Sequence, residues 1–565
     1  MNGAINIYQV FTRLFRNDKQ ANLPFGTIEE NGCSKFEHFS PIALQALKEF
    51  GITHIWFTGI NRHATCTSYE QYGLPANNSQ IVKGRAGSPY AITDYYDVDP
   101  DLATEPQNRM LEFEALVERC HSSGLKVIID FVPNHVARQY KSTNLPQGVM
   151  NLGENDNTNF AFLPTNNFYY EPNDTFRIPE GINLPYTNEA SSYLEFPAKA
   201  TGNDAFTAQP SINDWYETVK LNYGVDYLNN MQSHFDPIPD TWEKMVDIMK
   251  FWAQKGVDGL RCDMAELVPV EFWNWAIRQV KEENSRIIII AEVYKPQEYK
   301  RFLAAGFDYL YDKVGLYDIL RALIEGYGSA RDITMLWQQY EGYSHKMLRF
   351  LENHDEQRIT SPQFANNPWK ALPAMILAAT LNTGPLMVYF GQEIGEKATD
   401  SEGFSGYDGR TTIFDYWSVT EYQKWVNKGT FNSQLLSEEQ NKLRNFYQKL
   451  NQLRIHSAAI NAGSFYDLMW VNSHVNTNKI YAYIRHHGKE VVLVVLNFDL
   501  QNEHSIKLKF PIDAIRIAGL STTKTWKATE VITQNFSTSF HPFEAEHEGI
   551  ALQLKVSSGL VFRIS

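Results

Sequence analysis

The stretch VDGLRCD, from Val257 to Asp263, is followed along the chain by RIIIIAEV, from Arg286 to Val293. Both stretches are short and largely apolar, as expected of strands that are buried on both faces of a sheet. Each places an acidic residue, Asp263 or Glu292, at or near its carboxyl end. In a parallel barrel the active site is built at that end, so the two stretches indicate both a fold and the position of a site.

Six further apolar stretches of the same kind occur, and segments with helical patterns lie between them. They are Ile7–Phe11, Ile52–Thr58, Leu125–Val132, Phe307–Tyr311, Met347–Asp355 and Pro385–Glu393. Alternation of strands with helices predicts a parallel sheet with crossover helices. With eight strands we predict an α/β fold of the TIM type, a (β/α)8 barrel.

Start and stop signals define three of the intervening helices. The first begins at Ser40-Pro41, an N-cap residue followed by proline at the first helical position, and ends at Gly51. The second covers residues 108–123 and ends at Gly124, and the third covers residues 240–254 and ends at Gly256. Strand, helix, glycine and strand therefore form the repeating unit of the barrel.

Two regions interrupt this repeat. Residues 136–239 form a long insertion after the third strand, and a loop of that length must have its own structure or function. After about Ala462 the pattern changes to alternating strands without helices, and KIYAYIR, a turn at residues 486–488 and VVLVVLNF predict a hairpin. We therefore predict a barrel from residues 1–135 and 240–461, an inserted domain at 136–239 and a C-terminal β-sandwich at 462–565.

Composition excludes several classes of function. The chain has 565 residues, of which 51 are Lys or Arg and 65 are Asp or Glu, and no basic run indicates a nucleic-acid partner. No apolar run approaches the ~18 residues of a membrane helix. The four cysteines form no C-x-x-C pair, which argues against a zinc or redox site. No export signal precedes the strand at Ile5–Phe11, so a cytoplasmic location is expected.

Polar residues end five of the eight predicted strands. Besides the two acidic residues above, Pro133-Asn134-His135 follows strand three, Asn353-His354-Asp355 ends strand seven and Gln392-Glu393 ends strand eight. Each alone has an ordinary explanation, because a single histidine such as His135 is more often structural than catalytic. Such explanations would have to hold at five strand ends at once. We therefore predict that Asp263, Glu292, Asp355 and Glu393 converge at one rim, where crowding raises carboxyl pKa values.

The residue types narrow the chemistry further. The chain contains no G-x-S-x-G elbow, no H-E-x-x-H helix, no phosphate loop and no G-x-G-x-x-G turn after a strand. What remains is a set of carboxylates accompanied by two histidines and Arg261. Paired carboxylates in such surroundings are typical of enzymes that cleave glycosidic bonds.

Four segments of the chain resemble the signature sequences of one enzyme family. They are Asp130–His135 (DFVPNH), Gly259–Asp263 (GLRCD), Ala291–Val293 (AEV) and Phe350–Asp355 (FLENHD). Their order and spacing are similar to those of the α-amylase superfamily, glycoside hydrolase family 13. The resemblance extends from Ile5 into the β-rich tail, whose implied counterpart is domain C of that family, while the insertion corresponds to domain B.

The resemblance implies a role for each residue at the rim. Asp263 would attack the anomeric carbon and form a covalent glycosyl intermediate, Glu292 would be the proton donor, and Asp355 would stabilise the transition state. Arg261 lies two residues before Asp263, on the same face of its strand, and would keep that carboxylate ionised. The implied substrate-binding residues are Tyr90, Asp130, His135, Arg261 and His354, together with Lys220 and Asn222.

Lys220-Leu221-Asn222 resembles the fifth signature of neopullulanase-like and cyclodextrin-degrading members. Calcium-dependent α-amylases carry Lys-His three and four residues after the nucleophile, where this chain has Glu266 and Leu267. Asn134 matches a common calcium ligand of the family. The resemblance therefore implies that no cofactor is required and leaves calcium at Asn134 as an open possibility.

Three functions remain. The first is hydrolysis of α-glucosidic linkages, mainly α-1,4, in maltooligosaccharides, starch or cyclodextrins. The second is glucanotransferase activity with the same residues, which differs only in whether water or a sugar accepts the glycosyl group. The third is an inactive barrel that binds sugars, which we disfavour because all three carboxylates are present. An α-glucan is the expected partner, with no nucleic acid and no membrane, and the oligomeric state stays open.

Overall fold

The computed structural model describes residues 3–182, 192–400, 406–533 and 536–565. Its centre is an eight-stranded parallel sheet in the order β15-β14-β13-β12-β5-β2-β1-β16. The strands are β1 (Asn6–Phe11), β2 (His54–Thr58), β5 (Lys126–Phe131), β12 (Gly259–Cys262), β13 (Ile288–Ala291), β14 (Tyr309–Tyr311), β15 (Met347–Leu348) and β16 (Leu386–Tyr389). Each overlaps one of the eight predicted stretches, and only β1 begins one residue earlier than predicted, so the predicted barrel is confirmed.

Hydrogen bonds just beyond β15 close the sheet into a barrel. The backbone N–H of Arg349 donates to the carbonyl of Pro385 at 3.0 Å, and the N–H of Met387 donates to the carbonyl of Arg349 at 2.8 Å. Apolar side chains fill the interior, among them Ile7, Trp56, Ile128, Ile290 and Leu348. The interior of the barrel is therefore a packed apolar core and not an open channel.

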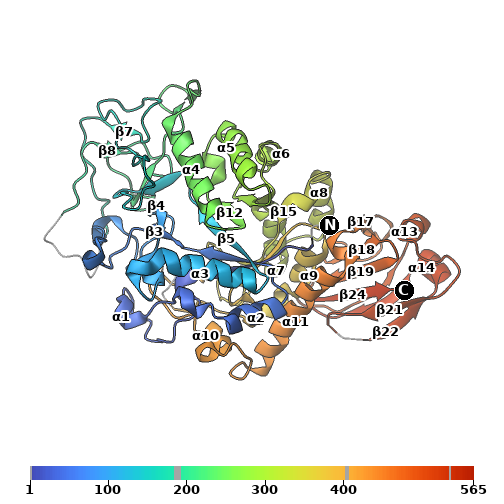
Figure 1. Ribbon diagram of the computed structural model, residues 1–565. Coiled ribbons are helices and arrows are strands. Elements are labelled where there is room, and N and C mark those ends of the chain that lie inside the picture. The colour runs from blue at the N-terminus through green and yellow to red at the C-terminus, as the bar shows by residue number, and fades with distance from the viewer. Residues whose placement is uncertain (1–2, 183–191, 401–405, 534–535) are drawn as a thin grey trace.

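Helices surround the barrel, as Figure 1 shows. The three predicted helices are present as α2 (Pro41–Glu49), α3 (Arg109–Ser122) and α4 (Asp240–Gln254), and the Ser40 hydroxyl caps α2 by accepting from the backbone N–H of Ala43. The others up to the tail are α1 (Ile28–Asn31), α5 (Val270–Glu283), α6 (Tyr299–Ala304), α7 (Asp318–Glu325), α8 (Arg331–Gln339), α9 (Leu372–Thr380), α10 (Thr420–Val426), α11 (Glu438–His456) and α12 (Ala458–Asn461). The main apolar core lies between these helices and the sheet.

The segment between β5 and α4 contains long loops and three short antiparallel pairs, and lies at the upper left of Figure 1. The pairs are β6 (His135–Ala137) with β9 (Thr218–Lys220), β7 (Tyr170–Glu171) with β8 (Ala198–Lys199), and β10 (Val225–Asp226) with β11 (Gln232–Ser233). Because β6 begins at His135, directly after the third barrel strand, the segment starts at the rim where the site was predicted.

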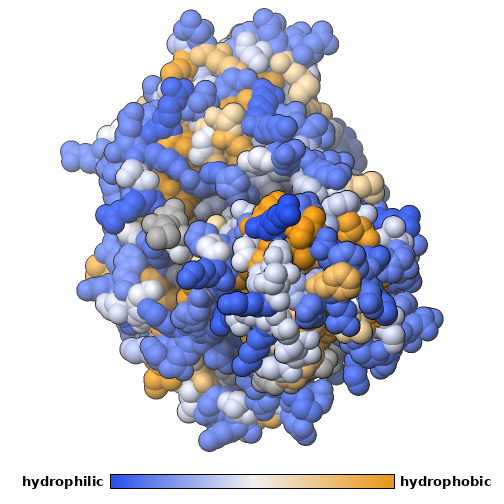
Figure 2. Space-filling view, turned by 90° about the vertical axis from the view of Figure 1, so that its right-hand side faces the viewer, coloured by the Kyte–Doolittle hydropathy of each residue, from blue (hydrophilic) through white to orange (hydrophobic). Residues whose placement is uncertain are grey.

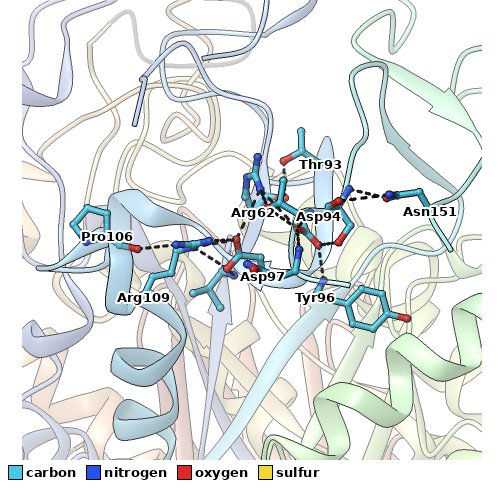
Figure 3. Close-up of polar contacts among 12 residues, drawn as sticks. Arg62, Thr93, Asp94, Tyr96, Asp97, Pro106, Arg109 and Asn151 are labelled. Atoms are coloured by element: carbon cyan, nitrogen blue, oxygen red, sulfur yellow. Dashed lines mark hydrogen bonds and ion pairs between the residues drawn. The ribbon is translucent and has the colours of Figure 1, made fainter. Parts of the chain in front are cut away.

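A buried polar network ties this insertion to the barrel (Figure 3). Its centre is Asp94 in β4 (Ile92–Val98), which pairs with β3 (Asn61–His63). The Asp94 carboxylate accepts from the Ser142 hydroxyl at 2.5 Å and from the backbone N–H of Thr143 at 2.7 Å, while Arg62 lies 3.6 Å away. Since backbone and side-chain donors of the insertion converge on one carboxylate, the start of the insertion is held in a defined position.

The C-terminal region forms a six-stranded antiparallel sheet, β17-β18-β19-β24-β21-β22, and a separate pair, β20-β23, around a second apolar core. The strands are β17 (Ser464–Asp467), β18 (Ile480–His487), β19 (Glu490–Asn497), β20 (His504–Leu508), β21 (Trp526–Glu530), β22 (Ser537–Phe540), β23 (Ile550–Leu554) and β24 (Ser558–Ile564). The predicted hairpin is β18–β19, in which His487 pairs with Glu490.

The predicted C-terminal β domain is confirmed, but it also contains two short helices that the sequence did not reveal. Two short helices, α13 (Ile512–Ile517) and α14 (Pro542–His547), pack Ala514, Ile515 and Ala545 against the second core. Helices of six residues are too short for their apolar periodicity to be recognised in a sequence.

The face of the molecule on the side of this C-terminal region is largely hydrophilic, with separate hydrophobic patches (Figure 2). Patches of that kind are normal for a protein surface. Within the part of the chain that the structure describes, every helix is too short or too polar to span a bilayer.

Candidate functional site

Three of the predicted carboxylates share one cavity at the carboxyl ends of the barrel strands. Asp263, Glu292 and Asp355 line a cavity of about 360 Å³, together with Tyr90 and His135. This volume is at the lower end of the range for small-molecule sites. The sequence therefore predicted correctly that acidic residues from three distant strands meet in one place.

Alternation along the strands explains how these side chains enter the cavity. Side chains two residues apart point to the same face of a strand, so Glu292 lies above Ile290 and Asp130 above Ile128, both in the barrel interior. Arg261 is paired in register with Asp130 on one side and Ile290 on the other. The residues of the site thus form the polar layer directly above the apolar filling of the barrel.

Arg261 is the central cation of the site and is fully buried. Its guanidinium lies 2.8 Å from an oxygen of Asp263, 2.7 Å from Glu292 and 3.2 Å from Asp130, and its Nε donates to the Tyr311 hydroxyl at 3.2 Å. One positive charge therefore lies next to three carboxyl groups, and it can balance the negative charge of only one of them.

The carboxyl pKa values reflect this imbalance. Burial raises the pKa of Asp263 well above its usual value, and the neighbouring carboxylates add to that effect while Arg261 opposes it. Burial and then the Glu292 carboxylate raise the pKa of Asp355 to about 7, and burial raises that of Asp130 to about 6. Burial and the crowding of carboxyl groups therefore both act against ionisation of these three residues.

Two neutral histidines complete the polar layer. Nδ1 of His354 lies 2.8 Å from the amide nitrogen of Gln9, and its Nε2 lies 2.5 Å from the Tyr90 hydroxyl and 3.1 Å from Asp355. Burial lowers the pKa of His354 well below its usual value and that of His135 to about 3. Uncharged imidazole rings both donate and accept hydrogen bonds, which suits them to contact hydroxyl groups.

Lys220 and Asn222 do not line the cavity. The Lys220 ammonium donates to Asn134 Oδ1 at 2.6 Å and lies 2.6 Å from Asp204. The Asn222 amide donates to the carbonyl of Leu163 at 2.8 Å, and its oxygen accepts from the backbone N–H of Gly224. Both side chains thus bind other protein groups, and the structure gives no support to the predicted substrate contacts.

The surroundings of Asn134 do not fit a calcium ion. Its side-chain oxygen faces the Lys220 ammonium, and its amide nitrogen donates to the carbonyl of Gly202 at 2.7 Å. Calcium takes six to eight oxygen ligands, and here a protein cation already occupies the position next to the oxygen. Among the residues that the structure describes, no group of three or more His, Cys, Asp or Glu side chains is placed to hold a metal.

Glu393 does not join the other carboxylates, which corrects the sequence-based expectation. Strand β16 ends at Tyr389, and the chain turns at Gly391 with a positive φ of 89°. Glu393 then accepts from the Tyr8 hydroxyl at 2.7 Å. Because the turn separates Glu393 from the strand, the alternation that orients Glu292 does not apply to it.

Several residues of the cavity were not predicted from the sequence. They are Lys83, Ser88, Ile212, Trp215, Glu217, Thr218, Met264, Tyr294, Ile413 and Phe414. Most lie in loops, where no periodicity shows which way a side chain points. Tyr294 is an exception, because it lies two residues after Glu292 and alternation could have suggested it.

Comparisons with known proteins identify the family to which the two domains are similar. The family model described as alpha amylase, catalytic domain, matches residues 41–463, and that of the alpha amylase C-terminal all-beta domain matches residues 470–542. A cyclomaltodextrinase from a Bacillus species is 23% identical and covers 87% of this chain and 72% of its own. Neopullulanase 2 of Thermoactinomyces vulgaris is 24% identical, covering 87% and 68%. Among solved structures, a maltogenic alpha-amylase from Thermotoga neapolitana has a TM-score of 0.62 at 22% identity and covers 99% of this chain and 98% of its own.

Proposed function

This chain belongs to the alpha-amylase family, and we propose that it is a retaining α-glucan hydrolase whose nucleophile is Asp263. As a member of glycoside hydrolase family 13 it is an enzyme that acts on α-glucans. The observation that carries the proposal is the shared cavity of Asp263, Glu292 and Asp355 around the buried Arg261. Two carboxyl groups at one cavity are what the double-displacement mechanism requires.

In the first step Asp263 forms a bond to the anomeric carbon while the glycosidic C–O bond breaks. Glu292 transfers its proton to the departing oxygen, so the leaving sugar departs as an alcohol. In the second step Glu292 takes a proton from water, the new oxygen attacks the anomeric carbon, and the bond to Asp263 breaks. Inversion at each of the two steps leaves the anomeric configuration retained.

Other residues that line the cavity, and His354 behind Tyr90 and Asp355, would bind the sugar ring. Asp355 would stabilise the positive charge that develops on the ring, because an oxocarbenium-like state needs a nearby negative charge. His135, His354 and Tyr90 would hydrogen-bond or stack against the same glucose unit. The position of the Tyr90 ring, 5.3 Å from His354 and nearly parallel to it, supports a common platform for that unit.

For the substrate we propose α-1,4-linked glucans, namely maltooligosaccharides, starch or cyclodextrins. Similarity to proteins named as a cyclomaltodextrinase and a neopullulanase supports this choice of substrates. Transfer to a sugar acceptor is the second candidate, favoured by the similarity to a cyclomaltodextrin glucanotransferase of Geobacillus stearothermophilus, which is 22% identical over 88% of this chain and 60% of its own. Incubation with one pure maltooligosaccharide separates the two, because transfer yields products longer than the substrate.

The test of the nucleophile is Asp263→Asn, with Asp258→Asn as a matched control. Asp258 lies just before the amino end of β12 and accepts from the backbone N–H of Val127, far from the cavity side of the strand. Turnover of maltotriose should fall by roughly 1,000-fold or more in Asp263→Asn and remain close to normal in the control. Near-normal turnover in a folded Asp263→Asn protein would refute the assignment.

The test of the proton donor is Glu292→Gln. Substrates with good leaving groups need no protonation, so this variant should retain formation of the glycosyl intermediate from a glycosyl fluoride while losing cleavage of maltotriose. Equal losses of that first step on both substrates would contradict the role of Glu292.

A further inference from the structure

We propose that Tyr294 and Glu266 are positioning residues for Glu292, and that the Tyr294 hydroxyl stabilises Glu292 as the carboxylate that the second step requires. The proposal rests on the proposed function of Glu292 as acid and base. It concerns two residues outside the four signature segments.

The contact between Tyr294 and Glu292 is direct. The Tyr294 hydroxyl donates to Glu292 Oε1 at 2.5 Å, and both residues line the cavity. The other oxygen, Oε2, accepts from the backbone N–H of Met264 at 2.8 Å and lies 2.7 Å from the Arg261 guanidinium. Each oxygen of the Glu292 carboxyl group therefore has a donor, an arrangement that favours its ionised form.

Glu266 holds Tyr294 in place. It lies in the short helical turn Ala265–Leu267, just after the nucleophile strand, and its side chain is 9% exposed. Its Oε2 accepts from the backbone N–H groups of Tyr294 at 2.9 Å and Lys295 at 3.1 Å. One carboxylate thus joins the loop after β12 to the loop after β13, and it fixes the backbone position from which the Tyr294 side chain extends.

The charges around Glu292 explain why a dedicated donor is needed. Six titratable groups face Glu292, and they come from five neighbouring segments. They are Asp130 in β5, Arg261 in β12, Asp263 directly after β12, Tyr294 in the loop after β13, Tyr311 in β14 and Asp355 in the loop after β15. Three of these are carboxyl groups that oppose ionisation of a fourth. The single guanidinium is shared among three of the carboxyl groups, whereas the Tyr294 hydroxyl contacts Glu292 alone among them.

The tyrosine donates without losing its proton. Burial and then the Glu292 charge raise the pKa of Tyr294 well above its usual value, so the phenol stays protonated throughout the reaction. In the first step the proton of Glu292 leaves with the sugar oxygen, and the hydroxyl of Tyr294 stabilises the carboxylate that is formed. In the second step that carboxylate accepts the proton of water while the bond to Asp263 breaks, and Tyr294 is unchanged.

Tyr294→Phe tests the proposal, because it removes the hydroxyl and keeps the ring. The substitution removes a hydrogen bond that stabilises the charged form of Glu292, so the alkaline limb of kcat/KM for maltotriose should move up by about one pH unit. On 4-nitrophenyl α-maltoside, whose good leaving group makes the second step limiting, kcat at neutral pH should fall, by about tenfold at most, because less of the base is ionised.

Two further sets of variants serve as controls. Tyr170→Phe removes a comparable hydroxyl, which donates to Asp156 at 2.9 Å in the insertion, and should leave the pH profile unchanged. Glu266→Ala should shift the alkaline limb in the same direction as Tyr294→Phe but by less. Glu266→Gln keeps an acceptor oxygen for the two backbone N–H groups and should restore the normal profile.

The proposal would be overturned if the alkaline limb of the kcat/KM profile did not move in Tyr294→Phe. A rise in KM with no other change would also overturn it, because that would indicate a contact with substrate only. These outcomes differ from failure of the proposed function. If Glu292→Gln cleaves maltotriose normally, the acid role itself is wrong. If Glu292→Gln is inactive while the limb of Tyr294→Phe is unmoved, only the inference about Tyr294 is wrong.

Discussion

Replacing Lys220 by methionine should destabilise the insertion that forms one wall of the cavity. The Lys220 ammonium is buried and lies 2.6 Å from both Asn134 Oδ1 and Asp204 Oδ1. It connects the end of the third barrel strand to β9 and to the loop that carries Asp204. Methionine has a similar apolar stem, so the substitution removes the charge and its three donors with little change in packing.

The size of the effect follows from the exposure of the partners. A hydrogen bond between a charged group and a buried amide oxygen contributes about 1.5–3 kcal/mol. The pair with Asp204 counts for less, about 0.5–1 kcal/mol, because the Asp204 side chain is 32% exposed and its charge is screened by water. Together these contacts stabilise the folded protein by about 3 kcal/mol relative to Lys220→Met.

Thermal unfolding followed by circular dichroism measures this difference, and limited proteolysis shows whether the insertion opens first. Lys199→Met is the matched control, since Lys199 lies in the same insertion but only 3.6 Å from Glu195 and is more exposed. The control should change stability by less than about 1 kcal/mol. Equal effects of the two substitutions, or a saturable rise in the melting temperature of the unaltered protein with calcium, would refute the reasoning.

Three shorter predictions concern the same cavity. Dialysis against a chelator should leave activity unchanged, because the Lys220 ammonium faces the Asn134 oxygen, and a loss that added calcium restores would contradict this. His135→Gln should lower kcat/KM about tenfold while leaving both limbs of the pH profile in place, because burial holds the pKa of His135 at about 3 and the ring is neutral at working pH. A limb near neutrality that disappears in this variant would show that His135 titrates there. Asp130→Asn should move the acid limb to lower pH, because the Asp130 charge raises the pKa of Asp263 and its removal also frees Arg261 to pair with that carboxylate; an acid limb that stays in place or rises would argue against this coupling.

The sequence was sufficient for the barrel and for the core of the site. Strands that are buried on both faces produce apolar stretches that can be counted, and each of the eight overlaps an observed strand. The family suggested by the four signature segments is confirmed by the match of its model to residues 41–463. Because parallel strands bring their carboxyl ends to one rim, the positions of Asp263, Glu292 and Asp355 after the strands in the sequence were sufficient to predict that they meet.

Only the tertiary structure decided the contacts between segments that lie outside the strand and helix repeat of the barrel. Lys220 and Asn222 belong to a recognisable sequence pattern, yet their side chains find partners within the insertion. Glu393 leaves the rim because a turn at Gly391 breaks the alternation. Trp215 enters the cavity from a loop, whose backbone direction depends on contacts such as the hydrogen bond from its N–H to Asn203 Oδ1 and not on local periodicity. Periodicity in the sequence shows which face of a strand a residue occupies. The residue that its side chain contacts in another segment depends on how separate segments pack in three dimensions.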